Sequence, residues 1–242
     1  MAVSGAAQRP PKAAMLVAQR ILQDALRKGL GAGDLLEPER TMLEKYQTGR
    51  GTLREALRLL EFQGVISLKP GPRGGPVLQN PDAAHLGSTL VLLMQLRSAP
   101  FRNIVEVRSA VEPMISSLAA SRMTDEELEE LRGILEEMDA CETVEAFVAN
   151  DLRFHRLIGN ASRNPVLASV LESFSTPMSR TRVWRGVTQV NAIDQTKAQH
   201  AALYDALAHH RPDVARAVAT AHIAGVEAWL EAALDEPDAL AA

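Results

Sequence analysis

The sequence is poor in three features that would each have indicated a class of protein. Cys141 is the single cysteine, so the chain can form neither an internal disulfide nor a thiolate zinc cluster. The longest apolar run, around Leu90–Leu93, is far shorter than a membrane span, and residues 1–11 have no apolar stretch of signal-peptide length. Aromatic residues make up only 4% of the chain. These scarcities predict a soluble protein of a reducing, cytoplasmic compartment with no membrane partner.

The charge is unevenly distributed along the chain. Hydrophobic residues fill 46% of the 242 positions, which is enough for a buried core and excludes wholesale disorder. The net charge of −4 taken alone argues against a nucleic-acid binder. Residues 1–80, however, have 12 Lys and Arg against 7 Asp and Glu, a net of +5, whereas residues 81–242 have 14 against 23, a net of −9. This split predicts two domains with different partners.

The first 46 residues predict two helices separated by a glycine-rich break. The first helix covers about residues 12–28, where Val17, Ile21 and Ala25 are spaced by four. Glycines over residues 29–33 end it, and because this run follows a helix rather than a strand, we reject a dinucleotide-binding loop. Pro38 suits the first turn of a second helix that ends near Tyr46.

A third helix and a hairpin follow a short turn that contains Gly49. Arg50, Arg54 and Arg58 are spaced by four and fall off the apolar stripe of this helix, so they present a cationic edge. Residues 65–68 and 77–78 predict two short strands around a turn rich in proline and glycine, and such a hairpin needs the helices to pack on. The stripe itself consists of Leu53, Ala56, Leu57 and Leu60.

This order of elements over residues 12–79 is that of a winged helix-turn-helix. The third helix would then be the recognition helix, with Arg50 and Arg54 in its first turns, where such helices meet base edges and phosphates. Arg73, flanked by Gly74 in the hairpin, suits the tip of the wing. The alternative is that these basic side chains are merely solvated. Three arginines and a wing together favour DNA binding.

The same segments carry a family resemblance. Residues 33–40 (GDLLEPER), 50–61 (RGTLREALRLLE) and 64–66 (GVI) are similar to the GntR family of bacterial transcription regulators. The resemblance implies that Arg40, Arg50 and Arg54 hold DNA, with Thr52 beside them, and that Gly74 belongs to the wing.

The sequence departs from the family pattern at a few positions. The usual Pro-Ser before the Glu-Arg pair is Glu37-Pro38 here, and Gly49 and Gly51 replace small polar residues on either side of the first recognition arginine. The lost hydroxyls predict an atypical affinity or operator preference.

The back half predicts helices alone. Thr124 and Glu127 form a capping-box pattern, Asn164 before Pro165 fits an N-cap and first helical position, and Pro212 opens the last helix. After a linker at about residues 80–84, we expect a bundle of six or seven helices over residues 84–236. The predicted fold class is therefore mostly α, with a small two-stranded wing in the front half.

Four side chains of the bundle have the chemistry of metal ligands. Asp151 and His155 share a helix face because they are four residues apart, and His200 and His222 lie on two later helices. A bundle can bring such faces to one interior point, where three imidazoles and a carboxylate suit a divalent transition metal with open positions. Spacing alone favours the alternative, in which the histidines are simply buried and satisfied.

A second resemblance covers about residues 84–236. Residues 151–158 (DLRFHRLI) with Asn164, His200 and His222, and residues 107–113 (VRSAVEP), resemble the FCD ligand-binding domain of the FadR branch of GntR regulators. It implies that Asp151 and the three histidines hold a metal, with zinc or nickel as the candidates, and that a small organic acid binds there. Arg108 would pair with the acid's carboxylate; its alternative is a surface ion pair with Glu112.

These observations lead to one main hypothesis and two alternatives. The main hypothesis is a transcription repressor that binds an inverted-repeat operator as a homodimer and responds to a small carboxylate at the metal. The first alternative is a metal-dependent hydrolase or lyase using the Asp and three His. The second is a metal-free regulator that senses an acyl ligand.

Overall fold

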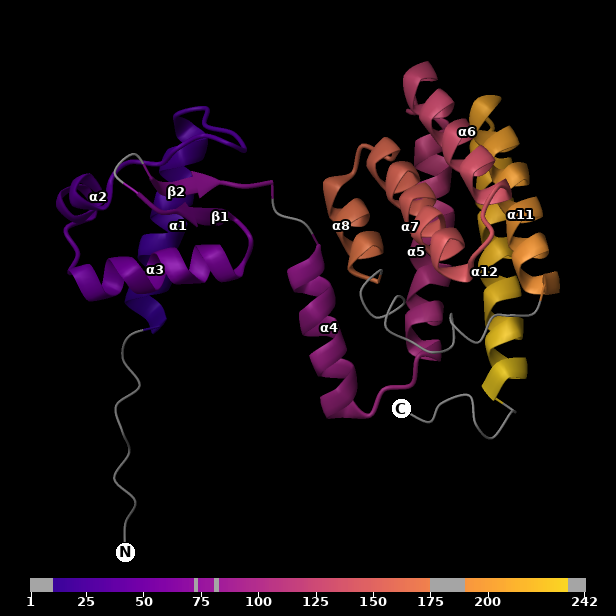
Figure 1. The fold of residues 1–242 in the computed structure, drawn as a ribbon, viewed down its shortest axis with the longest axis horizontal. Helices are drawn as coiled ribbons and strands as arrows, with labels where there is room; N and C mark the ends of the chain where they lie inside the picture. Colours follow the sequence, from indigo (N-terminus) through magenta and orange to yellow (C-terminus); the bar gives the residue numbers. More distant parts are fainter. Residues whose placement is uncertain (1–10, 72–73, 81–82, 175–189, 235–242) are drawn as a thin grey trace, which may run out of the picture. The chain divides into compact units, whose positions relative to one another are not determined.

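The computed structural model describes residues 11–71, 74–80, 83–174 and 190–234. The chain divides into two compact units, residues 1–85 and 86–242, each described here by itself (Figure 1). Within the described ranges the chain is mostly helical and has one two-stranded sheet, as the sequence predicted. None of the described helices is long and apolar enough to cross a membrane.

The first unit packs three helices and a hairpin around one core. Its α3 packs against α1, and the four apolar residues predicted to form the buried stripe of α3 are at most 3% exposed. They meet Val17, Ile21 and Ala25 of α1, so the predicted periodicity is confirmed. The elements are α1 (Pro11–Arg27), α2 (Glu39–Tyr46), α3 (Arg50–Phe62), β1 (Ile66–Lys69) and β2 (Gly75–Leu78).

The hairpin is antiparallel, with Ile66 opposite Leu78. At its turn, a Cβ added to Gly74 would lie 2.1 Å from the carbonyl oxygen of Lys69, so no residue with a side chain fits there without moving the backbone. Gly74 therefore has a conformational role in the wing, in addition to any role toward DNA. Arg73, the predicted wing tip, lies outside the described residues.

A polar cluster ties α2 to α1. Lys45 Nζ lies 2.8 Å from Asp24 Oδ2 and 3.2 Å from Glu37 Oε2, and the Tyr46 hydroxyl donates to Asp24 Oδ2 at 3.1 Å. The hydrogen bond from Lys45, aided by that from Tyr46, lowers the pKa of Asp24 to about 2 although burial opposes the shift. The cluster thus fixes the helix that precedes the recognition helix.

The second unit is a helical bundle in which α5 packs against α7, α8, α11 and α12 (Figure 1). The predicted capping box is present, because Thr124 Oγ1 accepts from the Glu127 amide and Glu127 accepts from the Thr124 amide. Asn164 caps α8 as predicted. The elements are α4 (Ala84–Arg97), which starts at the end of the first unit, α5 (Arg102–Ala120), α6 (Asp125–Asp139), α7 (Val144–Ala161), α8 (Pro165–Ser173), α11 (Val190–Ala208) and α12 (Pro212–Leu234).

Candidate DNA-binding surface and metal centre

The cationic edge of α3 is exposed. Arg50, Arg54 and Arg58 all face away from the buried stripe, as predicted. The Arg54 side chain is 70% exposed, and its Nε lies 4.0 Å from Glu39 Oε2. An exposed contact of this length holds the guanidinium weakly, so it leaves the side chain available to a ligand.

The neighbouring candidates differ in accessibility. Arg40, at the start of α2, is 92% exposed with only a 3.7 Å contact to Glu44, whereas Thr52 is half-buried. Gly49 caps α3 without a side-chain hydrogen bond, and a helix start of this kind attracts phosphate through its amides.

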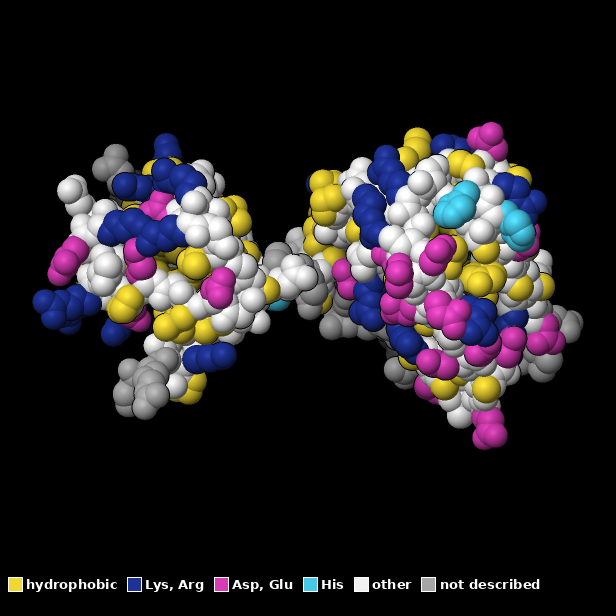
Figure 2. Space-filling view, turned by 90° about the horizontal axis from the view of Figure 1, so that it is seen from above, with side chains coloured by type: hydrophobic (Ala, Val, Ile, Leu, Met, Phe, Trp, Pro, Cys, Tyr) yellow, Lys and Arg dark blue, Asp and Glu magenta, His cyan; other side chains and the backbone are white. Residues whose placement is uncertain are grey.

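On the visible face of the first unit, Lys and Arg are prominent, while Asp and Glu gather on the lower part of the second unit's visible face (Figure 2).

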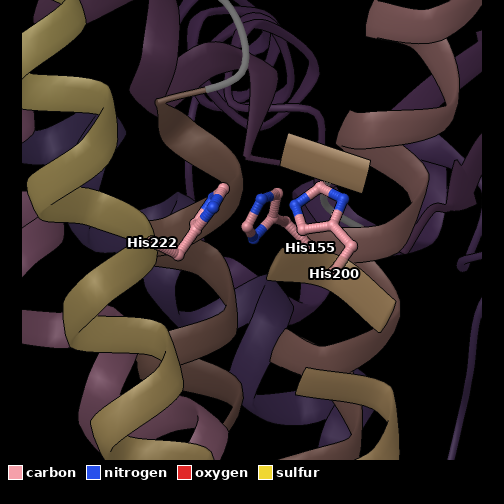
Figure 3. A group of neighbouring side chains, drawn as sticks. All are labelled: His155, His200 and His222. Atoms are coloured by element: carbon pink, nitrogen blue, oxygen red, sulfur yellow. The ribbon is translucent and has the colours of Figure 1, made fainter. Parts of the chain in front are cut away.

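Three histidines from three helices meet inside the bundle. His155 comes from α7, His200 from α11 and His222 from α12, and the imidazoles point toward one another (Figure 3). One ring nitrogen of each lies within 4.8 Å of those of the others, and all three residues are buried. Asp151 lies one turn before His155, with Oδ1 3.7 Å from His155 Nε2 and 3.6 Å from His200 Nε2. The structure thus brings all four sequence-predicted ligands together.

The polar atoms at the centre of this cluster are unsatisfied. A buried polar atom without a partner costs free energy, and native proteins contain few of them. Here several converge on one point, and their nitrogen and carboxylate chemistry is that of zinc and nickel sites, so the residues fit such an ion. The atoms with no hydrogen-bond partner among the described residues are Asp151 Oδ1, His155 Nε2, His200 Nδ1 and Nε2, and His222 Nε2.

The outer nitrogens of two rings have polar neighbours that sequence reasoning missed. Glu112 Oε2 lies 3.3 Å from His155 Nδ1, and Gln199 Oε1 lies 2.9 Å from His222 Nδ1. Arg108 Nε donates to Glu112 Oε1, and both side chains are at most 4% exposed. The alternative predicted from the sequence, an ion pair of Arg108 with Glu112 on the surface, therefore named the correct partner, but the pair is buried. Burial would raise the pKa of Glu112, but Arg108 and His155 together outweigh it and hold that pKa below its usual range.

Burial controls ionisation at the centre. It lowers the pKa of His222 to about 3 and that of His200 well below its usual value, and the neighbouring imidazoles add to both shifts. It raises the pKa of the Asp151 carboxyl. Burial would also lower the pKa of His155, but the carboxylates of Glu112 and Asp151 together outweigh it and raise that pKa. His200 and His222 are thus held neutral, in the form that ligates metals.

A winged helix-turn-helix with exposed arginines, joined in one chain to a helical unit with a buried cluster of histidines, is the architecture of a DNA-binding regulator with a sensor domain. Comparison with known families agrees. Residues 14–73 match the family described as bacterial regulatory proteins, gntR family, and residues 103–225 match the FCD domain. The chain belongs to the gntR family of bacterial regulatory proteins and carries an FCD domain.

Individual relatives place the chain among transcription regulators. The galactonate operon transcriptional repressor of Escherichia coli K12 is 32% identical over 199 residues, covering 79% of this chain and 85% of that one. The regulator LutR of Bacillus subtilis is 26% identical over 213 residues, covering 86% and 96%. The solved GntR structure from Streptococcus agalactiae has the same fold, with a TM-score of 0.68, 22% identity and coverage of 89% and 99%. The enzyme alternative is accordingly not favoured.

Proposed function

We propose that this regulator is a metal-dependent repressor that releases its operator when a small organic acid binds. Asp151, His155, His200 and His222 would hold one divalent ion, zinc or nickel, and the acid's carboxylate would complete its coordination. The observation that carries the proposal is the set of buried, unsatisfied ligand atoms on these four residues. A bound ion would take one nitrogen of each imidazole and the Asp151 oxygen, and so give most of these atoms a partner at once.

The spacing of the cluster supports one ion rather than scattered histidines. Two nitrogens at about 2.0–2.1 Å from one tetrahedral zinc ion lie about 3.3–3.4 Å apart. The three imidazole nitrogens all lie within 4.8 Å of one another, so side-chain movements of the order of 1 Å would bring them to the separation that one ion needs. Four protein ligands leave one or two coordination positions open on an ion that accepts five or six ligands. The effector would bind at these open positions.

The charges around the cluster favour an anionic effector. The described buried side chains include two carboxylates, Asp151 and Glu112, and one guanidinium, Arg108, so their net charge is one negative charge. A divalent ion would turn this into one positive charge, which one carboxylate neutralises. A relative named as a galactonate operon repressor is consistent with an acid of this kind.

Arg108 is the proposed second anchor for the effector. Its guanidinium is buried in the same unit and holds Glu112, which in turn lies beside His155. An effector carboxylate that reaches Arg108 would have to share this guanidinium with Glu112, because a fork of five donors can serve two carboxylates.

DNA recognition would use the first unit in two copies. We assign DNA binding to residues 12–79 and effector binding with dimerisation to residues 84–236. A two-fold dimer reads an inverted repeat, and it would act in the cytoplasm, where bacterial operators are. The proposed contacts come from the recognition helix, the start of α2 and the wing, through Arg40, Arg50, Thr52, Arg54, Arg73 and Gly74.

The test starts from operator DNA selected by the full-length protein from random duplexes. Hydroxy, keto, sugar and dicarboxylic acids are then titrated against the zinc-loaded and the metal-free protein. We expect at least one acid to raise the melting temperature of the loaded protein only, and to weaken operator binding in fluorescence anisotropy. An acid that binds the loaded protein tightly without changing DNA affinity would contradict the coupling. Undiminished binding of the acid to Arg108→Ala would remove Arg108 from the effector site.

A further inference from the structure

The three imidazoles of the cluster are held in three different ways. His155 faces a carboxylate at Nδ1, and His222 faces an amide oxygen at Nδ1. The ring of His200 stacks on Phe154, a fully buried residue, with centroids 4.2 Å apart and planes 21° apart. Two of the three rings are therefore oriented by a hydrogen-bond acceptor behind them.

An acceptor behind Nδ1 decides what Nε2 can do. A neutral imidazole carries its proton on one nitrogen and a lone pair on the other, and a carboxylate or carbonyl oxygen keeps the proton on the nitrogen it faces. With the proton on Nδ1, the lone pair of Nε2 is free to ligate. In both His155 and His222, Nε2 is the buried atom without a partner among the described residues.

We infer that Glu112 and Gln199 are positioning residues for the metal, which fix His155 and His222 as Nε2 ligands, and that Arg108 fixes Glu112. This inference rests on the proposed function, because it assigns roles toward the same ion. It names residues outside the predicted ligand set, and it gives the buried Arg108–Glu112 pair a purpose other than effector binding. Outer partners of this type orient the ligand and raise its basicity.

The two partners are not equivalent. Glu112 is an anion on α5 with its charge balanced by Arg108 four residues earlier, so His155 is backed by a full negative charge. Gln199 is neutral and lies on α11, and it reaches His222 on α12. Gly225, one turn after His222, gives it room, because a Cβ there would lie 3.1 Å from Gln199 Nε2. We therefore expect the loss of Glu112's charge to lower the affinity for the metal more than the loss of Gln199's amide does.

The experiment measures zinc affinity of the full-length protein by competition with a chelator at fixed pH. Gln199→Leu should weaken zinc binding by about 10- to 100-fold. Gln195→Leu, the same change at an exposed position one turn earlier on α11, is the matched control and should leave it unchanged. Gln199→Glu keeps an acceptor at the same place and should retain the affinity.

The role of Glu112 must be tested with variants that still fold. Glu112→Gln keeps the shape but leaves Arg108 facing a neutral amide, with Glu106→Gln on the exposed side of α5 as its control. The double change Arg108→Met with Glu112→Leu removes the buried pair together, which proteins often tolerate better than losing one partner. Both should weaken zinc binding more than Gln199→Leu does, toward the upper end of the range of about 10- to 100-fold, while the helical circular dichroism is retained.

A spectroscopic readout separates positioning from general packing. Nitrogen-15 spectra of the metal-free protein, recorded at alkaline pH because the pKa of His155 is raised, report which nitrogen of each neutral ring carries the proton, and we expect Nδ1 in both His155 and His222. Gln199→Leu should change this for His222 alone. A wild-type ring protonated on Nε2, or wild-type zinc affinity in the Gln199→Leu and double variants, would overturn the inference while the metal site stands. A wild-type protein that binds neither zinc nor nickel would instead overturn the proposed function.

Discussion

Asp151 Oδ1 lies 3.6 Å from His200 Nε2, although 49 positions separate the two residues in the chain. Neither atom has a hydrogen-bond partner in the described structure. The contact brings a carboxylate with a raised pKa against an imidazole with a lowered one, so both groups lean toward their neutral forms without an ion. A divalent cation would favour the charged carboxylate and the neutral imidazole together.

The first prediction concerns metal content. Wild-type protein purified without chelators should hold one zinc or nickel per chain by elemental analysis, and His200→Ala or His222→Ala should lose it. At a metal concentration of about 100 times Kd, binding stabilises the folded state by about 2.7 kcal/mol, so the variants should lack the thermal shift on adding zinc. The control is His209→Ala, which removes an exposed histidine directly after the end of α11. A wild-type protein that folds normally without metal and shows no change in melting temperature on adding zinc would contradict the proposed metal site.

The second prediction concerns the recognition helix. Arg50→Ala or Arg54→Ala should weaken operator binding by about 1–3 kcal/mol if the side chain reads a guanine with two hydrogen bonds. Arg132→Ala on the surface of α6 changes the net charge by the same amount and should have little effect. Anisotropy titrations at one salt concentration measure all three. Parental affinity in both recognition-helix variants would show that the helix is misassigned.

The third prediction concerns the charge of the effector. Because the loaded site would carry one positive charge, a monocarboxylate should bind more tightly than its neutral amide. The coupling should be reciprocal, so that operator DNA lowers the affinity for the acid by the same factor by which the acid lowers the affinity for DNA, about 5- to 150-fold. Calorimetric titration of the acid and its amide, with and without operator, measures both. Equal affinities for acid and amide would contradict the charge argument.

The fourth prediction concerns the stability of the first unit at low pH. Asp24 has a folded pKa of about 2, below its ordinary value of 3.8. Its contribution is therefore fully present above about pH 4 and is lost as the pH falls through 2. Asp24→Asn should cost about 1 kcal/mol at pH 7, because partial solvent screening reduces the full linkage value, and this difference from wild type should shrink toward pH 2 and vanish below it. Urea unfolding followed by circular dichroism across this range measures it; a difference independent of pH would contradict the assignment.

Local signals in the sequence predicted the fold well. The stripe from Leu53 to Leu60, the capping box at Thr124 and the hairpin after residue 64 depend on residues close together in the chain, and each is present. Helix period, capping chemistry and turn composition act over a few residues, so one sequence is enough to find them.

The support around the site could not be predicted in the same way. Glu112 and Arg108 share a helix face, but only tertiary packing decides that this face is buried. Gln199 is next to His200 in sequence yet serves His222 on another helix. In the first unit, the contact of Asp24 with Lys45 joins two helices across the glycine-rich connection. Such pairs depend on how helices meet in space, which spacing along one helix does not encode.

The three helices that supply the histidines also set the order in which the protein can gain its abilities during synthesis. The first unit needs only residues up to about 85, and domains fold as units in the order they leave the ribosome. The ligand cluster needs His222, so it cannot assemble until nearly all of the second unit has been made. A chain interrupted between the two points would contain the winged helix-turn-helix and lack the proposed effector site. Such a fragment would also lack most of the unit to which we assign dimerisation, so paired operator binding and its control by the effector would become available together, only once the second unit has been made.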